Sequence, residues 1–193
     1  MTGLDHGAQS GRHALKERGM DLYETPDVAV HALIRAERLP RVIWECACGP
    51  GRIVNVLRSY GHMVYATDLV DYKCPDSESR VDFLMECPPS FAIGAIVTNP
   101  PFKLADQFVA HALRLGIPKV IMLLRLAFLE SERRSDILDN GLLARVYVFR
   151  KRLPMMHRNG WTGRLSTSGM AFAWFVWELG QQGPATIHRI SWE

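Results

Sequence analysis

The sequence predicts an α/β protein with a mostly parallel sheet, helices on both faces and an antiparallel hairpin at its C-terminal edge. Short apolar runs alternate with helical patterns along the chain, which favours strand–helix–strand units with right-handed crossovers. No helical pattern separates the last two apolar runs, so we expect these strands to pair antiparallel. With 193 residues, 48% of them hydrophobic, the chain is long enough for one domain with a substantial core.

We expect a flexible arm at residues 1–20 and a single domain at residues 21–193. The first twenty residues mix Gly, His, Lys and Arg without a sustained period and contain no hydrophobic signal core. No stretch of the sequence reaches the roughly 20 apolar residues that span a bilayer. The sequence therefore predicts a cytoplasmic protein with no membrane partner. Its four cysteines lack C-x-x-C spacing and are expected to be reduced and mostly buried.

The elements are expected in the following order. A helix begins at Thr25-Pro26-Asp27, where a hydroxyl N-cap, a proline at the first helical position and an acid coincide, and it ends before Pro40. Further helices are predicted from residue 53 to before Gly61, at 104–115, and at 128–138, the last being charged. The seven predicted strands are 42–44, 63–66, 81–84, 95–98, 120–124, 145–149 and 171–177.

A glycine-rich turn at residues 45–51 (ECACGPG) follows the first predicted strand and opens a helix. Glycines there let the backbone approach a ligand at the carboxyl end of the sheet. A dinucleotide-binding fingerprint requires a third glycine three residues after Gly51, but Val54 occupies that position, which weakens a reading as an NAD site. Asp68 ends the second predicted strand, where an acid can accept hydrogen bonds from both hydroxyls of a ribose. It can equally be a turn-forming residue.

Residues Asn99-Pro100-Pro101-Phe102 follow the fourth predicted strand. This segment resembles motif IV of the S-adenosylmethionine-dependent amino-methyltransferases. The resemblance implies a Rossmann-like, seven-stranded methyltransferase sheet, with S-adenosylmethionine as cofactor. It also implies that the Asn99 side-chain oxygen and the Pro100 carbonyl accept hydrogens from a target amine, in a turn made rigid by Pro101. Phe102 would stack on the target base. Such a transfer depends on orientation rather than on a strong base.

The resemblance extends over residues 23–102. An acid at the position of Glu45, usually Asp in the family, contacts the methionine end of the cofactor, and the acid at Asp68 contacts the ribose. Asp82 with Phe83 resembles the motif that contacts adenine. Residues 23–26 (YETP) resemble a Tyr-x-Thr-Pro element that closes over the methionine, although a plain helix start is the alternative. The implied cofactor-binding residues are Tyr23, Thr25, Pro26, Glu45, Ala47, Cys48, Gly49, Gly51, Asp68, Leu69, Asp82 and Phe83.

Positive charge is concentrated near the C-terminus. Residues 140–177 contain no acid and six Lys or Arg residues, so this stretch carries +6 and the remainder of the +3 chain carries −3. Such asymmetry favours a surface that meets a polyanion, and a solvated loop with chance charge bias is the alternative. The expected nucleic-acid contacts are Arg150, Lys151, Arg152, Arg158 and Arg164.

Adenine N6 in DNA is the predicted methyl acceptor, because the chain resembles compact, phage-type DNA adenine methyltransferases. The amine of a paired base lies inside the duplex, so the base must be flipped out or presented on a single strand. The amino groups of adenine or guanine in RNA and of glutamine in proteins are alternatives. A different class, a cofactor-binding subunit without turnover, would require a catalytic partner. A protein partner or a homodimer also stays open.

Overall fold

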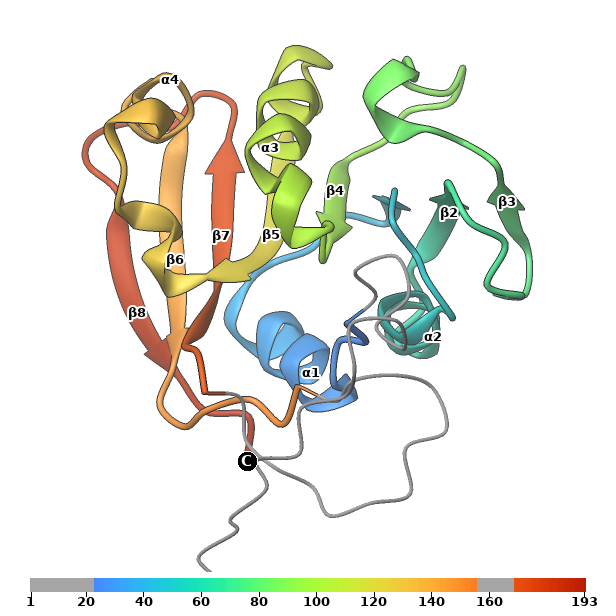
Figure 1. Ribbon diagram of the computed structural model, residues 1–193, viewed down its shortest axis with the longest axis horizontal. Helices are drawn as coiled ribbons and strands as arrows, with labels where there is room; N and C mark the ends of the chain where they lie inside the picture. The colour runs from blue at the N-terminus through green and yellow to red at the C-terminus, as the bar shows by residue number, and fades with distance from the viewer. Residues whose placement is uncertain (1–22, 156–168) are drawn as a thin grey trace, which may run out of the picture.

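A computed structural model describes residues 23–155 and 169–193. Within these residues, eight strands form a single sheet in the order β3-β2-β1-β4-β5-β7-β6-β8, with β3 and β8 at opposite edges (Figure 1). The arm expected at residues 1–20 lies outside the described residues. In the described part of the chain we find no helix with the length and apolar character needed to cross a membrane.

The strands are β1 (Val42–Glu45), β2 (Met63–Asp68), β3 (Ser77–Ser79), β4 (Ala95–Thr98), β5 (Lys119–Arg125), β6 (Leu143–Phe149), β7 (Phe172–Glu178) and β8 (Thr186–Ile190). The α-helices are α1 (Asp27–Ala36), α2 (Arg52–Ser59), α3 (Ala105–Arg114) and α4 (Ser135–Leu138). Short 3₁₀ helices are η2 (Phe83–Met85), η3 (Phe102–Leu104), η4 (Leu126–Leu129) and η5 (Glu132–Arg134).

The sheet is mostly parallel, as the sequence predicts. Strands β3, β2, β1, β4 and β5 run parallel, and β7 runs antiparallel to both β5 and β6. The expected antiparallel pairing of the last two predicted strands is therefore confirmed. The number of strands was wrong, because β3 and β8 were not predicted, and the hairpin of β6 and β7 does not form the edge, since β8 pairs parallel with β6 there.

Three local predictions were also wrong. The strand expected at residues 81–84 is replaced by η2, because the Asp82 carboxylate accepts a hydrogen bond from the Leu84 amide and turns the backbone. The helix expected at 128–138 is divided, since the Ser131 hydroxyl accepts from the Arg133 amide and starts a new turn. Helix α1 has Pro26, not Thr25, at its N-cap position and no side-chain cap.

The core forms two layers, one on each face of the sheet. On one face α1 and α2 pack against side chains such as Ile43, Val97 and Trp174. On the other face α3 and α4 pack against the strand residues adjacent in sequence to those three, such as Trp44, Ile96 and Phe175. Because successive side chains of a strand point to opposite faces, continuous apolar strands fill both layers. The expectation of helices on both faces is confirmed.

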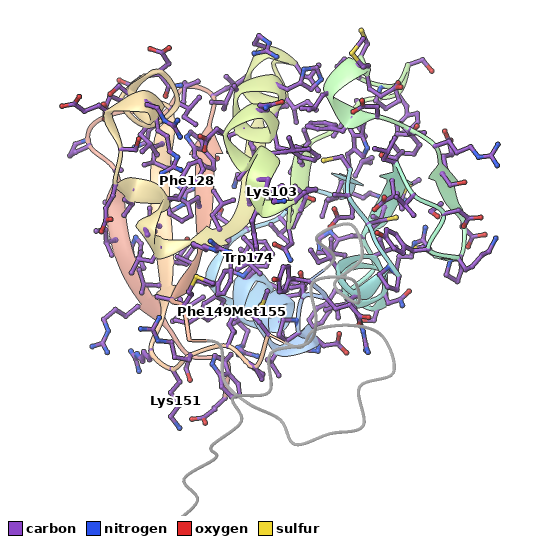
Figure 2. All side chains as sticks on the ribbon, in the orientation of Figure 1. Lys103, Phe128, Phe149, Lys151, Met155 and Trp174 are labelled. Carbon is purple, nitrogen blue, oxygen red and sulfur yellow. The ribbon has the colours of Figure 1, made fainter. Side chains whose placement is uncertain are left out.

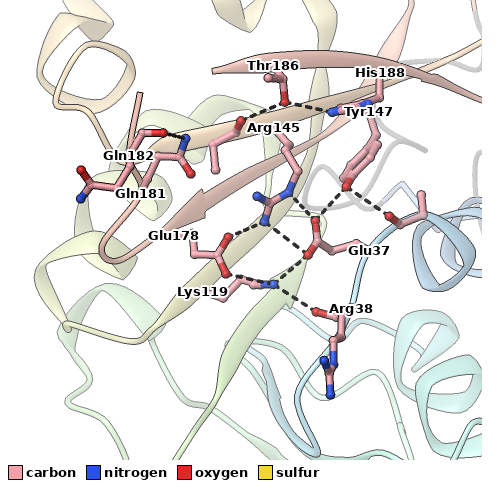
Figure 3. Close-up of polar contacts among 12 residues, drawn as sticks. Glu37, Arg38, Lys119, Arg145, Tyr147, Glu178, Gln181, Gln182, Thr186 and His188 are labelled. Carbon is pink, nitrogen blue, oxygen red and sulfur yellow. Dashed lines mark hydrogen bonds and ion pairs between the residues drawn. The ribbon is translucent and has the colours of Figure 1, made fainter. Parts of the chain in front are cut away.

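A partly buried ion network joins the end of α1 to the C-terminal strands (Figure 3). Glu37, directly after α1, lies 2.7 Å from Lys119 Nζ and 2.7 Å from Arg145 Nε. Glu178, at the end of β7, pairs with the same two cations, and the Tyr147 hydroxyl donates to Glu37. Arg145 belongs to the basic stretch noted in the sequence, but its charge is neutralised here. It is therefore not available to a polyanion.

Candidate active site

A cavity of about 460 Å³ lies at the carboxyl ends of β1, β2 and β4. This is the edge at which open, parallel α/β sheets bind ligands, and the volume suits a small organic molecule. Most residues singled out in the sequence line the cavity, although they come from segments far apart in the chain. They are Tyr23, Thr25, Glu45, Ala47, Cys48, Gly49, Asp68, Leu69, Asp82, Phe83, Asn99, Pro100, Pro101 and Phe102. Pro26 and Gly51 are not among the lining residues.

The glycine-rich turn is shaped by Gly51 and Asp68. Gly51 has a φ of 91°, and an added Cβ would lie 2.7 Å from Cys74 Sγ, so other side chains are unfavourable there. The Asp68 carboxylate accepts hydrogen bonds from the Gly49 and Val70 amides, each at 2.8 Å. Burial raises the pKa of Asp68, and these amides act against that shift. Asp68 thus forms the turn, and its remaining lone pairs can still accept from a ligand.

Glu45 is fully buried at the end of β1. Its Oε1 accepts a hydrogen bond from the Ala47 amide at 3.1 Å, whereas Oε2 has no partner among the described residues. Burial raises the pKa of Glu45 to about 8. The Thr98 side chain and the Ala47 amide act against this shift, and the Glu45 carboxyl group still holds its proton more tightly than an exposed acid does.

The raised pKa makes a prediction about stability. Between pH 4.5 and about 8 the folded protein retains a proton on Glu45 that the unfolded chain has lost. The free energy of unfolding should therefore fall as pH rises through this range, by up to about 1.4 kcal/mol per pH unit from this group. Urea unfolding of wild type and Glu45→Gln at several pH values measures the difference in slope. Parallel pH profiles for the two proteins would contradict a raised pKa.

Asn99 follows β4 and is oriented by the segment that precedes α1. Its Nδ2 donates a hydrogen bond to the Tyr23 carbonyl at 2.9 Å. Because a carbonyl only accepts, this contact fixes which end of the amide carries the oxygen. Asn99 Oδ1 is buried and has no hydrogen-bond partner in the part of the chain that the structure describes. The amide oxygen is therefore positioned to accept a hydrogen from a ligand.

The Phe102 ring is already in contact with aromatic and cationic groups. It stacks on Tyr23 with ring centroids 4.8 Å apart, and the Arg125 guanidinium carbon lies 4.6 Å from its centroid. Phe172, at the start of β7, is 5.6 Å away. A base that stacks on Phe102 must therefore compete with Tyr23 or Arg125 for the ring.

Phe83 and Asp82 have structural contacts as well as positions on the cavity wall. Phe83 is buried and packs edge-on against Trp44 at 5.2 Å. The Asp82 carboxylate caps η2 through Oδ1, which leaves its other oxygen able to accept from a ligand. Both residues are therefore compatible with the expected adenine contact.

Sequence reasoning missed several residues at this site. Glu24 and Arg52 line the cavity and form an ion pair at 3.0 Å. Glu24 occupies the variable position of the Tyr-x-Thr-Pro resemblance, so the motif gave no signal for it. Arg125 ends β5 next to the site, and its Nε is buried without a partner among the described residues. A charged residue directly after a buried strand was the signal that could have identified Arg125.

The expected nucleic-acid contacts differ in their surroundings. Arg150 and Arg152 are exposed and form no ion pair within residues 23–155 and 169–193. Lys151 pairs with Glu193 at 2.6 Å, and in Figure 2 it lies at the periphery, well away from Lys103 near the start of α3. Arg158 and Arg164 lie outside the described residues. Within the described residues, Arg150 and Arg152 are therefore the exposed members of the predicted basic surface that lack an acidic partner.

No protein-family model and no curated protein matches this sequence. Several solved structures resemble its fold. One is a Pyrococcus horikoshii protein provisionally described as an RNA methyltransferase, with a TM-score of 0.59 at 12% sequence identity. The match covers 82% of this chain and 87% of the Pyrococcus chain. Another is the 23S rRNA methyltransferase ErmE, with a TM-score of 0.56 at 15% sequence identity. The match covers 84% of this chain and 70% of the ErmE chain.

A third similar structure is the modification subunit of a provisionally assigned type I restriction enzyme from Vibrio vulnificus. Its TM-score is 0.57 at 12% identity, and the match covers 87% of this chain. This chain spans only 47% of the length of that subunit. At such identities the likeness concerns the fold and not the substrate. The strand order and these matches together show that the chain has the α/β fold of class I methyltransferases.

Proposed function

We propose that this protein is an S-adenosylmethionine-dependent methyltransferase that modifies an exocyclic amino nitrogen, adenine N6 in DNA. The observation that carries the proposal is the Asn99 amide. Its nitrogen is held by the Tyr23 carbonyl, and its buried oxygen has no partner among the described residues. A buried acceptor that lacks a partner is costly unless a ligand supplies the donor. A planar amine supplies two such donors.

The cavity also fits the proposed cofactor. Two buried acceptors without partners in the described chain belong to lining residues, namely Glu24 Oε1 and Asn99 Oδ1. These acceptors suit a ligand with cationic groups and hydroxyls, and S-adenosylmethionine carries an ammonium, a sulfonium and two ribose hydroxyls. Asp68 would hold the ribose and Asp82 the adenine. When bound, the cofactor supplies a methyl group on a positively charged sulfur.

The chain's own residues then need only to orient the amine. The Asn99 oxygen accepts one amine hydrogen, which draws nitrogen electron density out of the ring and directs the lone pair. Correct alignment can contribute about 7–11 kcal/mol in favourable cases, so a strong base is not required. The buried position of Pro100 and the apolar contacts of Phe102 limit the access of water to this point.

A nucleic acid is the substrate class that the charges favour. Arg150 and Arg152 follow β6, which runs parallel to β5, so they leave the sheet at the same edge as Arg125 and the cavity. Lys103, next to the Asn99 segment, adds an exposed cation that lines the cavity. Cations without acidic partners can hold phosphates while a base is withdrawn from its stack.

RNA is the alternative acceptor, because two of the similar structures carry names that refer to RNA methylation. Labelled methyl from S-adenosylmethionine, offered with duplex DNA, single-stranded DNA, total RNA or protein, distinguishes the candidates. We expect label on adenine in DNA. Label on RNA or on protein glutamine would retain the amine chemistry and replace the substrate. Cofactor binding without any transfer would favour a partner-dependent subunit, and absence of cofactor binding would contradict the proposal as a whole.

A further inference from the structure

Arg125 is a half-buried cation beside the Asn99 segment to which neither the motifs nor the proposed chemistry assigns a role. It is the last residue of β5, and its guanidinium carbon lies 4.6 Å from the centroid of the Phe102 ring. Within residues 23–155 and 169–193, the buried Nε of Arg125 donates to no acceptor and the guanidinium forms no ion pair. A buried donor without an acceptor is unfavourable. A ligand that supplied an acceptor here would remove this cost.

Arg134 shows that stacking on a ring does not by itself deprive an arginine of acceptors. Its guanidinium carbon lies 4.5 Å from the centroid of the Phe128 ring, nearly the same distance as at Arg125. Its Nε donates to Asp106 at 2.8 Å, and its Nη1 donates to the carbonyls of Phe128 and Glu130. The missing acceptor at Arg125 is therefore a property of its place in the fold.

Arg125 lies outside the cofactor cavity, on the β5 side of Phe102. The cavity is at the ends of β1, β2 and β4, and its lining includes Phe102 but not Arg125. Strand β5 adjoins β4 on the side opposite to β1. Phe172, the register partner of Arg125 on β7, also contacts the Phe102 ring, at 5.6 Å. A cofactor in the cavity leaves this β5 side as the approach to Asn99, so an incoming base meets Arg125.

We propose that Arg125 binds the target base by donating a hydrogen bond to a ring nitrogen next to the exocyclic amine. This inference rests on the proposed function. The Asn99 oxygen accepts from the amine, and adenine carries an acceptor nitrogen on each side of that amine, N7 on the major-groove edge and N1 on the Watson–Crick edge. A base that stacks on Phe102 from the β5 side takes the place of the guanidinium, and the long Arg125 side chain can then move to the edge of the base.

A base acceptor accounts for the buried Nε of Arg125 better than a phosphate does. The backbone of a nucleic acid stays outside the site when a single base is withdrawn from its stack. The exposed cations Lys103, Arg150 and Arg152 are available to those phosphates. Only a group that enters beside Phe102 reaches the buried Nε, and in the proposed reaction that group is the base.

The test combines a change in the enzyme with a change of one atom in the substrate. The nucleic acid that accepts methyl in the labelling experiment is prepared with adenine, 1-deazaadenine or 7-deazaadenine at the target position. Arg125→Met keeps an unbranched side chain over Phe102 but has no hydrogen-bond donor. For one analogue, replacing adenine should reduce kcat/KM by about 10- to 100-fold more in wild type than in Arg125→Met, as expected for a hydrogen bond to a charged group. Each analogue is compared between the two enzymes, so the intrinsic reactivity of its amine cancels.

Arg134→Met is the matched control, because it removes a guanidinium from the Phe128 ring outside the site. It should keep the wild-type ratio of adenine to each analogue, and thermal melts establish that every variant is folded. Arg125→Met should bind S-adenosylmethionine within about 2-fold of wild type, because Arg125 does not line the cavity.

An equal loss of transfer on all three substrates in Arg125→Met would assign Arg125 to a phosphate or to the shape of the site and overturn the inference. Unchanged transfer in this variant would overturn it too. Both results leave the proposed function standing. If wild type transfers methyl to no nucleic acid, the proposed function itself fails, and this inference fails with it.

Discussion

Asn99→Ala should reduce methyl transfer by about 10²- to 10³-fold, the cost typical of removing one polar group that stabilises a transition state. The variant loses the buried oxygen that would orient the amine and the hydrogen bond to the Tyr23 carbonyl. Affinity for S-adenosylmethionine should change little, because the acidic contacts expected for the cofactor lie at Glu45, Asp68 and Asp82. Single-turnover transfer and calorimetric cofactor binding, measured on the same preparation, check both expectations.

Asn99→Asp separates the two roles of the amide. It keeps an acceptor oxygen but cannot donate to the Tyr23 carbonyl, so part of the activity should remain. An Asn99→Ala enzyme with wild-type transfer rates would exclude this residue from the chemistry. Loss of cofactor binding and activity together would instead assign Asn99 to the shape of the cavity.

Glu37→Ala should lower the free energy of unfolding by about 3–5 kcal/mol, the range for breaking a buried ion pair by removing one partner. Glu37 is 8% exposed and contacts Lys119, Arg145 and Tyr147, so its loss leaves two partly buried cations with only Glu178. Urea unfolding monitored by tryptophan fluorescence measures the change. Lys151→Ala, in the exposed pair with Glu193, is the control and should change stability by less than about 1 kcal/mol.

The same network makes the acid limb of the stability curve steeper. Burial alone would raise the pKa of Glu37, but the hydrogen bonds from Arg145, Lys119 and Tyr147 outweigh it and hold the pKa below 4.5. The pKa of Glu178 is also lowered, again against the effect of burial. The contribution of Glu37 and Glu178 to the free energy of unfolding is therefore present above the ordinary carboxyl pKa. It is lost as the pH falls through their lowered pKa values. Glu37→Ala should lose less stability than wild type below pH 4.5, and equal acid limbs would contradict this account.

The main path of the chain could be predicted because its signals are local. A few consecutive residues are enough to recognise each of three features. These are the continuous apolar strands such as β5, the glycine-rich turn at the end of β1 and the Asn-Pro-Pro-Phe segment at the end of β4. Parallel strands then bring their carboxyl ends together, so Glu45, Asp68 and Asn99 meet without any further information. Strand β8 could not be predicted in this way, because Thr186–Ile190 is largely exposed and pairs with β6 through its backbone.

The sequence by itself determined the central strands and their helices, the edge of the sheet that carries the site and the identity of many residues that line the cavity. Only the tertiary structure decided which polar groups in that cavity have partners. Glu24 and Arg52 are 28 positions apart, and Glu37 and Arg145 are 108 apart, so no local pattern records that either pair meets. Asn99 likewise has its amide oriented by a carbonyl 76 positions away. Such contacts depend on how packed elements approach one another, which the composition and period of a single segment do not specify.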